Sequence, residues 1–342
     1  MENVGEFEPD PHWTEQLLLN FRVFNCKKIL VVNRVYAAEY SCYLPKYLNK
    51  HKNYDIIIFD DATPYLRNYD ARDMYNNLIQ LHLTKPWIII TSDFNYYKSA
   101  IKNIVYYPFH FLVGIYSARK TELDIKQLRK HYLGFLSFHN YEIRLITFLK
   151  LYQQKWFDKC LANYKPSHEL TPRQLQVLQN SIAQLNESEL NLLEKFNKQF
   201  PHGIVADSST TGLDFVSIDN TANTDCYINL MIESEYNLPF ITEKTIKPYL
   251  CGQFSAVLGN NFLYQHLQNL GIDTLQDYLE MQVWNSDPRQ TIDTILNRLS
   301  DLIVNIEQSW IDTYPRRLDN YYYVRSDKFI NKLDDGIKEW LT

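Results

Sequence analysis

Short apolar segments alternate with longer amphipathic segments along most of the chain. The apolar segments are rich in β-branched residues and are bounded by polar residues, which is typical of buried β-strands. The predicted strands are residues 28–32, 54–59, 87–91, 132–137, 226–232 and 254–258. Because strands that alternate with helices usually pair in parallel, the pattern predicts an α/β fold built from doubly wound parallel sheets.

Capping residues mark the start of several predicted helices. Thr171-Pro172 and Asp287-Pro288 each place an N-cap before a proline, and Asn186 precedes Glu187 and Glu189. These are favourable residues for the first turn of a helix. The predicted helices are residues 37–50, 72–83, 141–160, 190–200, 243–250, 288–302 and 305–323, and one more that starts at Thr171-Pro172. Residues 207–224 are rich in Ser, Thr, Asp and Asn and are expected to form a surface loop.

The α/β pattern occurs twice, on either side of a basic connector at residues 119–130. A chain of 342 residues is long enough for about two domains. We therefore expect two Rossmann-like domains facing a cleft, with residues 1–125 in the first and 126–304 in the second. Residues 305–342 would form a C-terminal helical segment. Ligands of such sheets bind beyond the carboxyl ends of the strands, often at helix N-termini.

Composition excludes several classes of protein. Hydrophobic residues make up 45% of the chain and charged residues 22%, so a largely disordered chain is excluded. The 35 basic and 40 acidic residues give a net charge of −5, which argues against nucleic acid as a partner. With only 9 glycines the chain has no Gly-rich phosphate loop. A nucleotide site would therefore use side chains and helix ends.

Features of targeting and redox chemistry point to a cytoplasmic protein. The acidic segment 1–13 lacks the pattern of a signal peptide, and no apolar segment approaches the length of about 18 residues that a membrane span needs. The five cysteines are scattered and lack CxxC spacing, so we expect buried, reduced thiols. The sequence leaves open whether the protein contacts a membrane peripherally.

Two segments combine residue types that suit a diphosphate. Ser137, Asn140 and Arg144 follow the strand at 132–137, where hydroxyl, amide and guanidinium groups could meet a helix N-terminus. His139, in the same turn, is a further candidate for contact with a phosphate. The alternative is an ordinary helix start with a surface arginine.

The second segment follows the strand at 226–232. Glu233 stands at the end of this strand, Thr242 is a suitable N-cap, and Glu243 and Lys244 fall in the first helical turn. A lysine opposes the helix dipole at this position, and an anionic ligand such as phosphate would account for it. Alternatively, Lys244 reaches solvent or pairs with Glu233.

These segments resemble a known signature. The residues Glu233-Ser-Glu, Phe240-Ile-Thr-Glu-Lys-Thr, Gly252 and Val257-Leu-Gly259 resemble the donor-binding signature of the α-1,3-fucosyltransferase-like glycosyltransferases of family 10. Ser137, Asn140 and Arg144 resemble the family's Ser-Asn…Arg segment, and the likeness covers about residues 132–300. The resemblance implies a GT-B fold, in which residues 126–304 bind a GDP-sugar donor and residues 1–125 lie on the acceptor side.

The resemblance also implies roles for individual residues. Glu243 would bind the ribose hydroxyls, and Lys244 and Arg144 would bind the diphosphate and stabilise charge on the leaving group. The other implied donor-binding residues are Ser137, Asn140, Glu233, Phe240 and Thr242. Three positions depart from the family pattern and leave the sugar open: Phe240 replaces Tyr, Ser234 replaces Asn and Ser255 replaces Pro. No Asp-x-Asp triplet is present, so we expect no metal or other cofactor.

A catalytic base should come from the first domain. Asp93 follows the strand at 87–91 and is the first candidate, ahead of Asp60 and Asp61; a turn cap is the alternative for Asp93. His110 is a packed histidine or lines the acceptor side. The tyrosines at 106–107 and 321–323 either stack on a glycan or pack in the core.

The sequence thus predicts an inverting, metal-independent glycosyltransferase that moves fucose or a related sugar from a GDP-sugar to a glycan hydroxyl. A non-catalytic nucleotide- or glycan-binding module and a GT-B transferase that uses a UDP-sugar are the alternatives.

Overall fold

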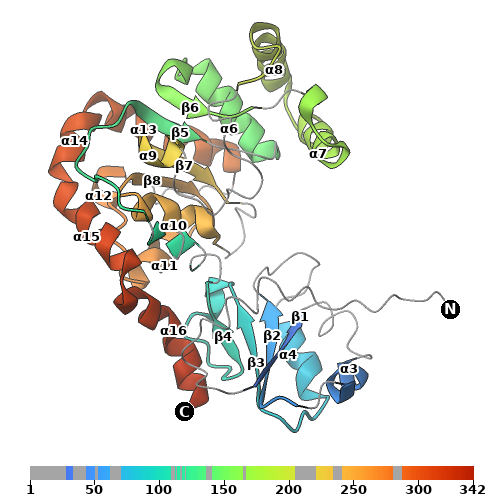
Figure 1. Cartoon of the computed structure of the whole chain (residues 1–342). Coiled ribbons are helices and arrows are strands. Elements are labelled where there is room, and N and C mark those ends of the chain that lie inside the picture. The colour runs from blue at the N-terminus through green and yellow to red at the C-terminus, as the bar shows by residue number, and fades with distance from the viewer. Residues whose placement is uncertain are drawn as a thin grey trace. The chain divides into compact units, whose positions relative to one another are not determined.

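The computed structural model describes residues 28–33, 44–50, 53–61, 71–108, 112, 114–115, 118–119, 121–135, 141–164, 167–204, 221–233, 241–279 and 287–342. The chain divides into two compact units (Figure 1). The first unit comprises Met1–Val113, Pro239–Ile241 and Asp327–Thr342, and the second comprises Gly114–Leu238 and Thr242–Ser326.

The first unit contains a four-stranded parallel sheet. Its strands follow chain order, β1-β2-β3-β4. They are β1 Ile29–Asn33, β2 Ile56–Asp61, β3 Trp87–Thr91 and β4 Ile104–Tyr106, with helices α3 Leu44–Lys50 and α4 Ala71–Ile79 between them. The isoleucines of β2 and β3 are buried, as their β-branched pattern predicts. The sequence prediction missed β4, which is only three residues long.

The last helix of the chain, α16 (Asp327–Leu341), belongs to the first unit and packs against β4. The Tyr107 hydroxyl donates a hydrogen bond of 2.9 Å to Asp334 Oδ1 on α16. Burial raises the pKa of the Asp334 carboxyl, and this hydrogen bond opposes the rise. A Cβ atom on Gly336 would lie 3.0 Å from Val105 Cγ1, so glycine allows the helix to approach the strand closely.

The second unit contains another four-stranded parallel sheet, in the order β6-β5-β7-β8. The strands are β5 His131–Phe135, β6 Cys160–Ala162, β7 Cys226–Ile232 and β8 Phe254–Leu258. Every residue of β7 and β8 is buried. The two parallel sheets and the helices between their strands confirm the predicted α/β fold class.

Ten α-helices are described in the second unit. They are α6 Glu142–Gln153, α7 Pro172–Ile182, α8 Glu187–Gln199, α9 Thr221–Thr224, α10 Glu243–Leu250, α11 Leu263–Asn269, α12 Gln276–Leu279, α13 Pro288–Val304, α14 Ile306–Asp312 and α15 Tyr314–Arg325. Capping at Thr171, Asn186 and Asp287 is confirmed, because each side chain accepts a hydrogen bond from a backbone amide of its helix.

Helix α10 is held between the sheet and α15. It packs on β7 and β8 on one side and on α15 on the other. From α15, Arg325 Nη2 donates to the Leu250 carbonyl at 2.9 Å and Arg317 Nη1 donates to the Gly252 carbonyl at 2.6 Å. Gly252 has a φ of 63°, and a Cβ atom there would lie 2.5 Å from Ile125 Cγ2. Glycine therefore permits the sharp turn that ends α10.

Several sequence predictions of local structure are wrong. Residues 221–224 form the short helix α9 rather than loop, and the helix expected over 305–323 is divided at Thr313 into α14 and α15. The helix expected to reach residue 160 ends at Gln153. There Lys155 adopts a left-handed conformation with a φ of 59°, and the Trp156 amide donates to the Leu151 carbonyl at 3.2 Å. This is a Schellman ending with lysine in the place that glycine usually takes.

We expect Lys155→Gly to be about 1 kcal/mol more stable than Lys155→Ala, because only the alanine variant keeps a Cβ atom in the left-handed region. Both variants lose the lysine charge, so the comparison isolates the backbone conformation. Urea unfolding of the two variants measures the difference. Equal free energies of unfolding would contradict the assigned conformation.

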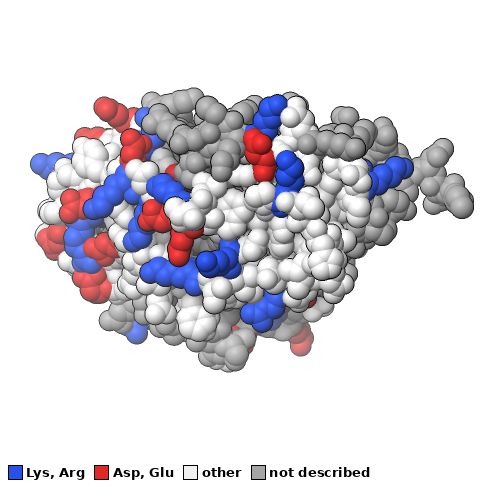
Figure 2. Space-filling view, turned by 90° about the horizontal axis from the view of Figure 1, so that it is seen from below, with Lys and Arg blue, Asp and Glu red and all other residues white. Residues whose placement is uncertain are grey.

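Charged side chains of both signs occur together on the surface. At the left of the view in Figure 2, Lys and Arg side chains alternate with Asp and Glu side chains.

Cys160, Cys226 and Cys251 are buried free thiols, and burial raises the pKa of Cys226 to about 12. Within the described part of the chain, no helix has both the length and the apolar character required to cross a membrane.

Candidate functional site

The order of strands in the second sheet singles out one part of its edge. The chain passes from β5 to its neighbour β6 and then returns to β7 on the other side of β5. In parallel sheets, ligands bind at the carboxyl ends of strands where the direction of winding reverses in this way. The described strands of the first sheet follow chain order without such a reversal. The candidate site therefore lies beyond the carboxyl ends of β5 and β7.

Arg144 lies at this edge. It is the third residue of α6, the helix after β5, and its side chain is 7% exposed. Its Nη2 atom donates a hydrogen bond of 3.0 Å to the carbonyl oxygen of Ile232, the last residue of β7. The guanidinium carbon also lies 5.4 Å from the centre of the Tyr141 ring. Arg144 is therefore not the surface arginine of the alternative interpretation.

Glu233 joins the end of β7 to the start of α10. Its side chain is 1% exposed and accepts hydrogen bonds from the Thr242 amide at 3.0 Å and the Thr242 hydroxyl at 2.8 Å. The Thr245 hydroxyl donates a further short hydrogen bond to the same carboxylate. Acidic groups are favourable at a helix N-terminus, where backbone amides lack partners within the helix. Glu233 thus positions α10.

Thr242 is the N-cap of α10, as predicted. Its hydroxyl oxygen accepts from the Lys244 amide at 3.3 Å, and Lys244 Nζ lies 3.4 Å from the same oxygen. Lys244 is half-buried in the first turn of α10. We call the group Arg144, Ile232, Glu233, Thr242 and Lys244 the β7–α10 site.

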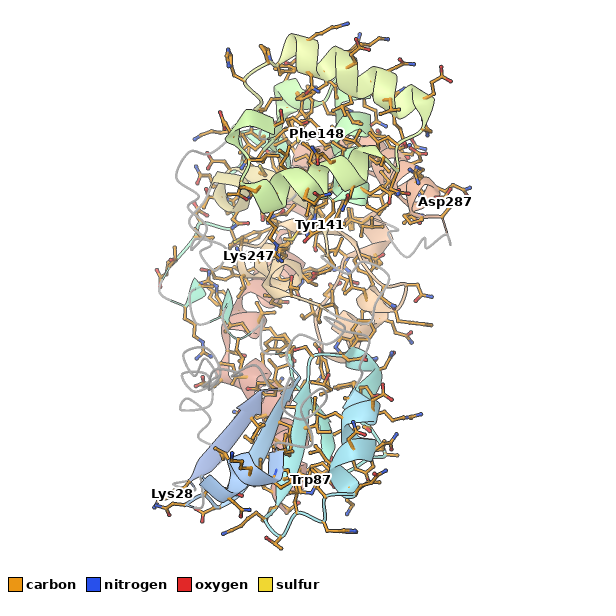
Figure 3. All side chains as sticks on the ribbon, turned by 90° about the vertical axis from the view of Figure 1, so that its right-hand side faces the viewer. Lys28, Trp87, Tyr141, Phe148, Lys247 and Asp287 are labelled. Atoms are coloured by element: carbon orange, nitrogen blue, oxygen red, sulfur yellow. The ribbon has the colours of Figure 1, made fainter. Side chains whose placement is uncertain are left out.

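Sequence reasoning missed two residues of α10. Thr245 binds the Glu233 carboxylate, and Lys247 is a buried lysine, 7% exposed, one turn after Lys244. Figure 3 shows where Lys247 and Tyr141 lie in the second unit. The spacing of three residues between Lys244 and Lys247 was the available signal, because it places both side chains on neighbouring positions of a helix surface.

The described side chains of this region carry more positive than negative charge. Arg144 and Lys244 are basic, and Glu233 is the acidic side chain that faces the helix start. The partial positive charge of the α10 N-terminus adds to the basic side chains. The arrangement can bind an anion with several oxygen atoms.

Several predicted site residues lie outside the described part of the structure. Ser137, Asn140 and Phe240 are among them, as are His139 and His110. Glu243 begins α10, but its side chain lies outside the described residues, as do the side chains of Asp60 and Asp61 at the end of β2. The roles of all these side chains stay predictions.

Asp93 caps a turn in the first unit. It follows β3, is 3% exposed, and its Oδ1 atom accepts a hydrogen bond of 2.8 Å from the Asn95 amide at the start of the 3-10 helix Phe94–Tyr96. Burial, and then the charge of Asp93, raise the pKa of Tyr106. The capping interpretation is therefore correct, and the role of Asp93 as a base stays a prediction.

The tyrosines proposed as sugar platforms differ in exposure. Tyr106 and Tyr107 are 6% and 1% exposed, so they pack in the core of the first unit. In the second unit Tyr321 is also buried, with the Arg325 guanidinium 3.9 Å from its ring centre, whereas Tyr322 is 64% exposed. Packing accounts for the three buried tyrosines.

Comparison with known proteins does not assign a family. No protein-family model matches the chain, and the searches of curated proteins and of solved structures give no match either. Among the described residues, no three His, Cys, Asp or Glu side chains are grouped so that they could hold a metal ion. Function is therefore argued from the β7–α10 site itself.

Proposed function

We propose that the chain is a metal-independent, inverting glycosyltransferase of GT-B architecture. It would transfer fucose or a related sugar from a GDP-sugar to a glycan hydroxyl. One observation carries the proposal: Arg144 bonds to Ile232, the last residue of β7, and Thr242, the N-cap of α10, bonds to the next residue, Glu233. Two of the segments that resemble the donor-binding signature, distant in sequence, are thereby joined at one strand end.

The residues of the β7–α10 site suit the departure of a nucleoside diphosphate. The acceptor oxygen attacks the anomeric carbon, the bond from that carbon to the diphosphate oxygen breaks, and the acceptor proton passes to a carboxylate. Negative charge then develops on the diphosphate, where Arg144 and Lys244 would stabilise it. Glu243 would bind the ribose hydroxyls and Asp93 is the candidate base, as the resemblance to family 10 implies.

Calorimetric titration with GDP, UDP and CDP, each with and without EDTA, tests this proposal. We expect GDP to bind most tightly and its affinity to be unchanged by EDTA, because basic side chains take the place of a metal. Selective binding of UDP or CDP would replace the proposed donor with another nucleotide sugar. Failure of all three to bind would contradict the proposal.

A non-catalytic nucleotide- or glycan-binding module is the second candidate. The observation that favours it is the turn cap at Asp93, which occupies the carboxylate expected to act as base. Such a module would bind GDP but release no GDP from GDP-sugars in the presence of glycan acceptors. GDP release that depends on an acceptor would exclude it.

A further inference from the structure

A hollow of about 240 Å³ opens in the second unit. Its lining includes Tyr132 near the start of β5, Cys160 at the start of β6 and Ile303 near the end of α13. In a parallel sheet the starts and the ends of strands lie at opposite edges. The hollow, which we call the β5–β6 hollow, is therefore separate from the β7–α10 site.

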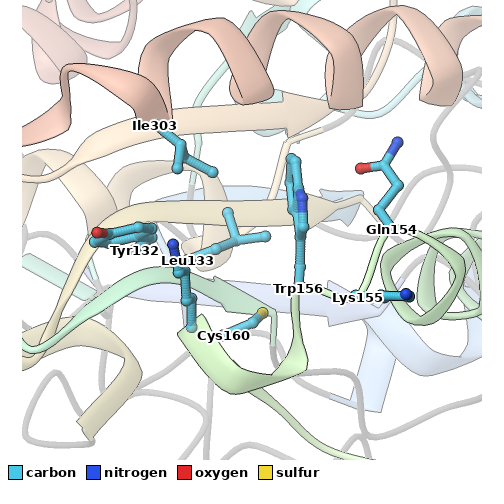
Figure 4. Close-up of a pocket in the computed structure, with 8 residues that line it drawn as sticks. Tyr132, Leu133, Gln154, Lys155, Trp156, Cys160 and Ile303 are labelled. Atoms are coloured by element: carbon cyan, nitrogen blue, oxygen red, sulfur yellow. The ribbon is translucent and has the colours of Figure 1, made fainter.

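Apolar and aromatic side chains form the walls of the β5–β6 hollow. Figure 4 shows Tyr132 and Trp156 at its two sides, with Leu133 and Ile303 between them. Two aromatic walls suit a flat ring. Pockets for drug-sized ligands usually measure about 300–1,000 Å³. The smaller volume here fits one ring with a short substituent.

Polar groups around the hollow define the rest of the ligand. Gln154 Oε1 is buried and accepts no hydrogen bond from the described residues. Because solvent does not reach this oxygen, a ligand in the hollow does not reach it either, and the charged side chains of the lining are left as the ligand's polar contacts.

Two lysines supply charge. Lys155 and Lys159 line the hollow, and Lys159 Nζ lies 4.8 Å from the centre of the Tyr132 ring. Asp158, which lies between them in sequence, is not part of the lining. The described charges at the hollow are therefore positive.

We propose that the β5–β6 hollow binds a small planar aromatic ligand that carries an anionic group. The ring lies between Tyr132 and Trp156, and the anionic group faces Lys159, whose ammonium lies near the Tyr132 ring. The proposal does not depend on the nucleotide assignment, because none of the residues that bind this ligand belongs to the β7–α10 site.

Ligand-observed NMR titration with 4-hydroxyphenylacetate tests the proposal. A ligand of this size is expected to bind with a dissociation constant of about 1 mM. The matched probe 4-hydroxyphenylacetamide has the same ring but no charge, and we expect it to bind about tenfold more weakly. Absence of binding by 4-hydroxyphenylacetate up to about 20 mM, or equal affinity of the two probes, would overturn the proposal.

Two substitutions in the lining and one control test whether 4-hydroxyphenylacetate binds in the β5–β6 hollow. Lys159→Gln should weaken binding of 4-hydroxyphenylacetate several-fold, and Ile303→Phe should abolish it by filling the hollow, whereas Lys195→Gln on the exposed side of α8 should leave it unchanged. Ile303 is half-buried near the end of α13, so its enlargement is compatible with folding. Binding that Ile303→Phe leaves unchanged would place the ligand elsewhere and overturn the proposal.

Discussion

Glu233→Ala is expected to lower the free energy of unfolding by about 4 kcal/mol, because the change leaves several buried donors without an acceptor. These donors are the Thr242 amide and the hydroxyls of Thr242 and Thr245. The start of α10 also loses the negative charge that its dipole favours. Chemical unfolding in urea measures the change.

Glu233→Gln distinguishes the sources of this stability. The glutamine keeps one acceptor oxygen for α10 but replaces the other with a donor and removes the charge, so we expect a loss about half as large. Glu194→Ala is the matched control, since Glu194 is an exposed glutamate on α8 whose ion pair with Lys198 is open to solvent. A free energy of unfolding for Glu233→Ala close to that of wild type would contradict the positioning role of Glu233.

The second large effect concerns acid stability and His266. This residue of α11 is 4% exposed, and burial lowers its pKa from 6.5 to about 3. Below pH 6.5 the unfolded chain binds a proton at this position and the folded chain does not. The free energy of unfolding therefore falls as the pH falls. From these two pKa values we expect a loss of about 2 kcal/mol between pH 7 and pH 5, and about 3 kcal/mol by pH 4.

Urea unfolding of wild type and His266→Gln across this pH range checks the expectation. The glutamine does not titrate, so the difference in stability between the two proteins should shrink, or change sign, as the pH falls. His202→Gln, which removes an exposed histidine after α8, is the control and should follow wild type. Parallel pH profiles for wild type and His266→Gln would show that His266 does not cause the acid sensitivity.

Six strands of the two sheets could be predicted because each is a compact apolar run with polar boundaries, whereas the three-residue strands β4 and β6 were missed. Trp87–Thr91 and Cys226–Ile232 have the bounds expected from sequence. The helix starts at Thr171 and Asn186 could also be predicted from the sequence, because capping is a local interaction between residues three apart. The end of α6 was not predicted correctly. A glycine at position 155 would have indicated the left-handed turn there, but the residue is a lysine.

Only part of the candidate site could be predicted from the sequence. The resemblance identified Thr242 and Lys244, and periodicity placed them on α10. The contact between Arg144 and Ile232 joins residues 88 positions apart, and no local pattern encodes such a distance. Glu233 was expected to bind the donor, whereas its described hydrogen bonds go to α10. Lys247 was missed because the sequence alone does not distinguish a buried lysine in a short helix from an exposed one.

The most direct test of the account is the affinity of GDP for Lys244→Ala, measured by calorimetry beside wild type and Lys195→Ala. Lys244 is half-buried in the first turn of α10, and Lys195 is an exposed lysine on α8. Loss of a charge-assisted contact to phosphate should weaken GDP binding by about 10- to 100-fold in Lys244→Ala and leave Lys195→Ala unchanged. GDP affinity in Lys244→Ala equal to that of wild type would contradict the assignment of the β7–α10 site as a nucleotide site.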